Sequence, residues 1–250
     1  IDSWTDFLPN EILTLDGKYG SINSLINFND ELYTIQDKAL AFISISPRVQ
    51  VQGSDGVAVQ LGTGSILDRY KYLSTEYGTL NKWSVVTSPS GLYFFDLLNK
   101  SFNVFKGSVV SLSTDKQMHH YFNNNIDLLL KTDNPLIKQG ISAGYDLVNN
   151  DVFMTFLQDG NNYTISYNER KNNFISFYDY LPSIYISKGD YFITTSPNNK
   201  SIYRQYHGEY NKFYDIYHPS SFVLNVNPES NNDCVFDNIN FKSDVTLNNV

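Results

Sequence analysis

Five carboxylates in the middle of the chain are the residues whose types could most readily do chemistry. They lie in or beside short polar turns between apolar runs. Two carboxyl groups roughly 5–10 Å apart can serve glycoside hydrolysis as general acid and as base or nucleophile. Turns also use Asp to bond their own backbone, and a sequence does not give separations in space. We therefore predict no catalytic residue and keep glycoside hydrolysis as an alternative, carried by Asp96, Asp146, Asp151, Glu169 and Asp179.

The four histidines and the single cysteine do not form the pattern of a metal or nucleophile site. His119 and His120 are adjacent, whereas two zinc ligands on one helix need a spacing of three or four residues to share a face. His207 and His218 are isolated, as surface or core histidines are. One cysteine, Cys234, allows no internal disulfide, and no His–Asn/Asp arrangement points to it as a nucleophile. We predict no metal, no cofactor and no disulfide.

Three polar loops resemble fragments of ligand-binding motifs. Residues 62–64 (GTG) lack the GxxxxGK[ST] pattern of a phosphate loop and a following helix. The Asn/Asp-rich stretches 27–31 and 158–162 could offer oxygens to calcium, but neither has the spacing of an EF-hand loop. We interpret all three as turns between strands.

Tyrosine is concentrated in the second half of the chain. Its apolar ring and polar tip suit interfaces and stacking against sugars, but tyrosine also simply covers half-buried strands. We keep both interpretations, and we expect a glycan-binding protein to expose Trp4 or Trp83 in a groove. The tyrosines concerned are Tyr163, Tyr167, Tyr178, Tyr180, Tyr185, Tyr191, Tyr203, Tyr206, Tyr210, Tyr214 and Tyr217.

Composition favours a β-rich chain that does not grip nucleic acid. Aromatic residues make up 15% of the 250 residues, and they are almost all Tyr and Phe, which favour strands. The formal net charge is −8, which argues against broad binding of DNA or RNA, because such binding needs clustered cations. No apolar run approaches the roughly 20 residues of a membrane-spanning helix. We predict no membrane span.

Short apolar runs alternate with turn residues in four groups along the chain. Each group has three or four predicted strands joined by tight turns, as in an antiparallel meander. Meanders that recur every 40–50 residues or so are typical of propeller blades, which leave few free sheet edges. We predict an all-β propeller of about five blades over residues 1–222, closed or incomplete, with a β-sandwich as the competing fold. The predicted strands are 25–28, 32–35 and 39–45; 83–87, 92–97 and 102–105; 141–146, 151–157, 163–168 and 174–178; and 183–187, 191–196 and 201–206.

One segment breaks this pattern and predicts a helix inserted between blades. Residues 113–131 can begin with Ser113 as the N-cap, although a run of three Asn weakens the helix. Four apolar residues fall at helical spacing, namely Met118, Phe122, Ile126 and Leu129.

The C-terminal stretch predicts a separate ending. A polar loop at 225–233 marks a boundary, and residues 223–250 are expected to form a last strand at 235–239 and an exit segment. Because the chain begins with Ile1, we expect a fragment or a processed product.

Several blocks of sequence carry a family resemblance. They are residues 62–102 (GTGSILDRYKYLSTEYGTLNKWSVVTSPSGLYFFDLLNKSF), 131–156 (KTDNPLIKQGISAGYDLVNNDVFMTF), 163–186 (YTISYNERKNNFISFYDYLPSIYI) and 235–241 (VFDNINF). Over about residues 60–241 the chain resembles the neck and tail structural proteins of crAss-like bacteriophages, variously labelled stabilisation or muzzle proteins.

The resemblance implies a non-catalytic component of the virion, located in the phage tail and built on a propeller. It implies other tail and neck proteins as partners, a homo-oligomeric ring in a much larger full-length protein, and a role in closing or stabilising the DNA outlet. The alternative is a carbohydrate-binding or glycoside-hydrolase propeller of a gut bacterium, extracellular or on the cell surface. A glycosidase would bring carboxylates together in its funnel, whereas a virion part would present apolar patches to its neighbours.

Overall fold

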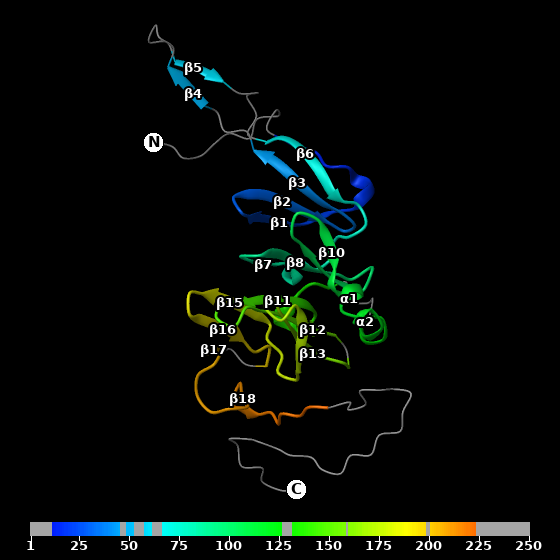
Figure 1. Cartoon of the computed structure of the whole chain (residues 1–250), viewed down its shortest axis with the longest axis vertical. Coiled ribbons are helices and arrows are strands. Elements are labelled where there is room, and N and C mark those ends of the chain that lie inside the picture. The colour runs from blue at the N-terminus through cyan, green and yellow to red at the C-terminus, as the bar shows by residue number, and fades with distance from the viewer. Residues whose placement is uncertain are drawn as a thin grey trace. The chain divides into compact units, whose positions relative to one another are not determined.

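The computed structural model describes residues 12–45, 49–52, 58–61, 67–126, 132–158, 160–198 and 201–223. The chain divides into two compact units, Ile1–His218 and Pro219–Val250. Every helix and strand named below belongs to the first unit (Figure 1). The predicted last strand at 235–239, the loop at 62–64, Trp4 and Cys234 lie outside the described residues.

The described part is predominantly antiparallel β-structure, which confirms the predicted class. It contains three four-stranded sheets, one three-stranded sheet and two separate hairpins, and none of these described sheets closes on itself. No described helix is long and apolar enough to span a membrane.

The first sheet has the strand order β1-β2-β3-β6. Asn29 and Asp30 connect β1 to β2 with φ values of 53° and 61°, the left-handed conformation that two-residue hairpin turns require. The first three strands confirm the prediction, while β6 and the separate hairpin β4–β5 were not predicted. The strands are β1 (Ile22–Phe28), β2 (Glu31–Gln36), β3 (Leu40–Ile45), β4 (Val49–Gln52), β5 (Ala58–Leu61) and β6 (Leu67–Ser74), after the 3-10 turn η2 (Gly17–Tyr19).

The second sheet has the order β10-β9-β8-β7 and follows a 3-10 turn, η3. The prediction of a strand from residue 83 was wrong at its start, because Trp83 lies in η3 and the strand begins at Val86. The elements are η3 (Lys82–Ser84), β7 (Val86–Ser88), β8 (Gly91–Asp96), β9 (Ser101–Phe105) and β10 (Val109–Ser111).

Two short helices, α1 (Leu112–Asp115) and α2 (His119–Asn125), replace the single helix predicted at 113–131. The helix breaks because Gln117 takes a φ of 59°. Ser113 is not the N-cap; its hydroxyl instead accepts the backbone N–H of Phe102 at 2.6 Å. Tertiary contacts with β9 therefore override the local helical pattern. Of the four apolar residues at helical spacing, Phe122 and Ile126 are buried, and Leu129 lies outside the described residues.

The strands predicted for the third and fourth sheets are confirmed, and their observed ends differ from the predicted ones by no more than about two residues. The third has the order β11-β12-β13-β14 and the fourth β15-β16-β17, followed by a small hairpin β18–β19. Their elements are η4 (Pro135–Ile137), β11 (Gly140–Asp146), β12 (Asp151–Leu157), β13 (Tyr163–Asn168), β14 (Asn173–Tyr178), β15 (Ile184–Lys188), β16 (Tyr191–Thr195), β17 (Ile202–Arg204), β18 (Lys212–Phe213) and β19 (Ile216–Tyr217).

Consecutive sheets pack face to face, and this stacking forms the core. Every residue of β8, β9, β12 and β13 is buried, which requires a cover on both faces of the sheet. On β8, Leu92 and Phe94 pack with the first sheet, while Tyr93 and Phe95 pack with the third sheet and α2. Burial of so much aromatic surface supplies the main stabilisation of the stack.

Candidate functional site

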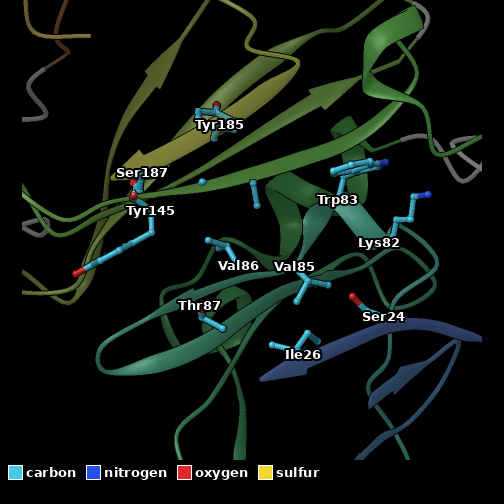
Figure 2. Close-up of a pocket in the computed structure, with 12 residues that line it drawn as sticks. Ser24, Ile26, Lys82, Trp83, Val85, Val86, Thr87, Tyr145, Tyr185 and Ser187 are labelled. Atoms are coloured by element: carbon cyan, nitrogen blue, oxygen red, sulfur yellow. Dashed lines mark hydrogen bonds between the residues drawn. The ribbon is translucent and has the colours of Figure 1, made fainter. Parts of the chain in front are cut away.

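The first strands of the four sheets line a common cleft with a volume of about 460 Å³ (Figure 2). Strand β1 contributes Ser24, β7 contributes Thr87, β11 contributes Tyr145, and β15 contributes Ser187. These residues are far apart in sequence, so the cleft exists only because each sheet places its first strand at the same side of the stack.

The wall between β11 and β15 is tightly packed. A Cβ atom added to Gly144 would lie 2.3 Å from the Cβ of Tyr185, so only glycine allows this approach. The Tyr185 and Thr155 hydroxyls are 2.5 Å apart, and the Ser187 hydroxyl donates to the backbone carbonyl of Tyr145. Both bonds connect the fourth sheet to the third, which fixes this side of the cleft.

Trp83 is the aromatic residue exposed at the opposite end of the cleft from Ser187 (Figure 2). Its side chain is 45% exposed, and the ammonium of Lys82 lies 5.3 Å from its ring centroid. Asp133 lies beside the turn that carries both residues, and it accepts hydrogen bonds from Asn81 and from the backbone of this turn. Burial raises the pKa of the Asp133 carboxyl, and these hydrogen bonds reduce that rise without cancelling it. Trp83 is thus presented in a groove, as expected of a glycan-binding protein, on a turn held by a half-buried acid.

The five carboxylates considered for glycoside hydrolysis do not line this cleft. Asp96 is buried and accepts the backbone N–H of Gly78 at 3.1 Å and that of Asn99 at 3.0 Å. Burial raises the pKa of Asp96, and these hydrogen bonds oppose that rise. Asp179 is mostly exposed and lies 2.7 Å from Nδ1 of His218. These two acids therefore hold loops in place.

Asp146 and Asp151 are the two of these acids that pair across adjacent strands, at the end of the β11–β12 ladder. Asp146 accepts the backbone N–H of Val148 at 2.9 Å, and Asp151 accepts Nδ2 of Asn168 at 2.6 Å. Burial raises the pKa of Asp151, and the neighbouring charge of Asp146 adds to that effect. Both carboxylates are buried; Asp146 is bonded to the β11–β12 turn and Asp151 to the end of β13, so this pair closes a hairpin.

Glu169 has the densest set of polar contacts of the five. Its carboxylate lies between the second and third sheets and accepts four hydroxyl groups, at 2.6 Å from two of them and 3.0 Å from a third. Burial favours the neutral acid, but the hydroxyls outweigh that effect and hold the pKa of Glu169 below its ordinary value. The donors are Ser88, Ser90, Tyr93 and Tyr145. Nothing in the sequence signals this role, because the four donors come from two segments, 88–93 and Tyr145, that are both distant from Glu169 along the chain.

Among the described residues, no three or more His, Cys, Asp or Glu side chains gather in a group that could hold a metal ion. His119 and His120 are exposed, and their rings contact the side-chain amides of Asn123 and Asn124 on the same helix. His207 is exposed. The stretch at 27–31 is the β1–β2 turn, as predicted.

Some of the tyrosines in the second half of the chain are buried against strands, and others are exposed, where they could serve an interface or stack against sugars. Tyr163, Tyr167 and Tyr180 are buried, and desolvation raises the pKa of Tyr167 to about 12. Four others are exposed on the fourth sheet and the segment that follows it, namely Tyr191, Tyr206, Tyr210 and Tyr217.

These features define an all-β protein of stacked meanders in which the acids join turns and sheets. The chain belongs to the crassvirus muzzle protein family, whose profile matches residues 1–198. It is also 32% identical over 247 residues to the protein named "Muzzle protein" of Bacteroides phage crAss001. That similarity covers 98% of this chain and 17% of the relative, so the chain spans a small part of the relative's length. The resemblance predicted from the sequence is confirmed.

Proposed function

We propose that this chain is a non-catalytic structural component of a phage virion, located in the tail and neck assembly. Membership of the muzzle family supports a virion role. The observation that carries the proposal is the set of bonds that the acids make: Asp96, Asp146, Asp151 and Glu169 are all bonded to turns, adjacent strands or neighbouring sheets. A rigid stack whose polar groups are occupied by structural bonds suits a part that bears load.

The stack is, in this proposal, part of a β-propeller over residues 1–222, with 223–250 as its exit segment. Two features support it: the four meanders pack face to face, and their first strands all reach the same cleft. Inner strands of propeller blades line a central channel in the same way. The full-length protein would form a homo-oligomeric ring that contacts other tail and neck proteins and helps to close or stabilise the DNA outlet. With a net charge of −8, this part would not retain DNA by displacing counterions.

The proposal is tested on purified particles. An antibody raised against the 250-residue chain is used for immunogold labelling of gradient-purified virions, and the same particles are digested for peptide mass spectrometry. We expect peptides of this chain in the virions and gold at the tail end only. Peptides found in infected-cell lysate but absent from purified virions would refute the virion role.

The exposed Trp83 favours glycan binding in the cleft as a second candidate function. Indole rings stack on sugar faces, and Lys82, Ser24 and Thr87 line the same cleft with groups that can bond sugar hydroxyls. The described lining contains no Asp or Glu, so this candidate is a binding site without hydrolysis. On a glycan array it predicts binding that Trp83→Ala abolishes and Tyr210→Ala, which alters a 95% exposed ring outside the cleft, preserves. An array on which the unaltered chain binds nothing would reject it.

A further inference from the structure

The fourth sheet has two faces with different surroundings. Tyr185 and Phe192 point to the third sheet, where both rings contact Phe153. The alternate residues form the opposite face, which we call the outer face. Its apolar members are the four isoleucines and one tyrosine at Ile184, Ile186, Tyr191, Ile193 and Ile202.

The outer face is mainly apolar, and no other sheet covers it among the described residues. Its polar members are Lys188, Thr195 and Arg204, and the guanidinium of Arg204 lies 4.3 Å from the ring centroid of Tyr191. Ile186 is 47% exposed, Tyr191 50% and Ile202 71%. The segment after β17 packs elsewhere, since the Tyr214 hydroxyl donates at 2.8 Å to Thr194, on the face that carries Phe192. Exposed isoleucines on adjacent strands are unfavourable in water, and soluble proteins keep such patches small unless a partner covers them.

The other sheets show what covers a face at this position in the stack. Tyr93 and Phe95 of the second sheet are covered by the third, and Phe153 of the third is covered by the fourth. In each case the cover is the next antiparallel meander. The outer face continues this series, so its geometry fits the apolar face of another sheet.

The size of the outer face decides whether that sheet belongs to a separate chain. Three strands about 4.8 Å apart, of which β15 and β16 have five residues and β17 has three, present a face of at most roughly 14 by 17 Å. Two such faces bury on the order of 500–800 Å² in total, below the roughly 1,000 Å² expected of a stable interface between separate proteins. A sheet tethered in the same polypeptide can pack on this area, because tethering supplies an effective concentration in the millimolar range.

We propose that the outer face is covered by a further antiparallel sheet of the same polypeptide, in the part of a muzzle protein that this chain does not span. The relative has room for it, because this chain aligns with only 17% of its length. The inference rests on the propeller arrangement in the proposed function and is independent of where the protein is located in the virion.

Cysteine labelling tests the cover directly. Ile202→Cys is introduced in a Cys234→Ser background, in the 250-residue chain and in the full-length muzzle protein that contains it. Labelling by a maleimide is followed at peptide resolution by mass spectrometry. Leu136→Cys is the matched control, because Leu136 is 61% exposed on η4, away from the fourth sheet.

We expect the thiol at 202 to react readily in the 250-residue chain and about tenfold or more slowly in the full-length protein, where reaction waits for local opening. The thiol at 136 should react at similar rates in both. Equal rates at 202 would overturn the proposal, as would protection in the 250-residue chain, whether in a monomer or a dimer. A protein absent from virions that still protects position 202 would refute the virion role and leave this inference standing.

As a second measurement, Ile186→Lys with Ile202→Lys should lower the Tm of the full-length protein and leave that of the 250-residue chain unchanged. A Tm loss of equal size in both would mean that the two isoleucines stabilise the described fold itself, which contradicts an external cover.

Discussion

Replacing Glu169 tests whether a half-buried carboxylate joins the second and third sheets. In Glu169→Ala the hydroxyl of Tyr93 loses its acceptor in a fully buried position, and Tyr145 loses its 3.0 Å bond to the same carboxylate. A hydrogen bond to a charged group contributes about 1.5–3 kcal/mol, and a buried donor left unpaired costs about 1–3 kcal/mol. Because these effects overlap, we expect a loss of about 3–4 kcal/mol in the free energy of unfolding. Glu169→Gln keeps one acceptor oxygen and should cost about 1–2 kcal/mol.

Urea unfolding followed by fluorescence measures this loss, and its pH dependence separates charge from packing. The folded-state pKa of Glu169 lies below its ordinary value of 4.5. The ionised carboxylate therefore stabilises the fold at pH values above 4.5, and this contribution is lost as the pH falls through the lowered pKa. The difference between the unaltered chain and Glu169→Gln should be full at pH 7 and shrink below pH 4.5.

Glu209→Gln is the matched control, since Glu209 forms an exposed ion pair with Lys212 and should change stability by less than about 0.5 kcal/mol. Two results would refute the reasoning about Glu169. One is a loss below about 1 kcal/mol in Glu169→Ala. The other is a Glu169→Gln difference that is as large at acid pH as at neutral pH.

Three further substitutions test the stack by thermal or urea unfolding. Gly144→Ala should destabilise by about 2–4 kcal/mol, because the added Cβ would lie 2.3 Å from Tyr185, whereas Gly17→Ala meets nothing within 4 Å and should be neutral; equal effects would contradict the close approach. Phe156→Ala removes a fully buried ring and should cost about 3–5 kcal/mol, and a cost below about 1 kcal/mol would mean that the second and third sheets are not packed through it. Asp30→Gly should stabilise by a few tenths of a kcal/mol up to about 1, because Asp30 has a φ of 61°; a loss of stability would show that its side chain contributes more than its strain costs.

The sequence predicted most strands because turn residues and strand residues are locally informative. Residues 151–157 and 163–168 were predicted at the bounds of β12 and β13. Turn residues mark the ends of the strands, because Asn and Asp adopt left-handed conformations that few other residues adopt. Asn29 and Asp30 between β1 and β2 are an example. The predicted strands also fell into the predicted groups, because consecutive strands in a meander pair with their neighbours in sequence. Strands β6 and β10, which complete the first and second sheets, were not predicted.

The site could not be predicted in the same way, because it depends on contacts between sheets. Glu169 has a side chain of a type that can catalyse hydrolysis, which made it a candidate in the sequence. Its hydroxyl partners, however, lie 24 to 81 residues away along the chain. Likewise, the helical spacing of Met118 and Phe122 is real, but Ser113 at the start of α1 is bonded to β9, and the helix breaks at Gln117. Tertiary bonds of this kind leave no local pattern for a reader of the sequence to find.

The bonds between sheets also explain why the cleft forms where it does. Apolar burial is non-directional, so ring packing alone would let one sheet rotate on the next. Directional bonds near the first strands remove that freedom: Asn23 donates to the carbonyl of Thr79 at 2.7 Å, Glu169 joins the second and third sheets, and Ser187 bonds to β11. Each sheet is thereby fixed in angle against its predecessor. A further sheet on the outer face would keep the same angle only if it brought a polar partner to β15, in addition to an apolar face for the four isoleucines.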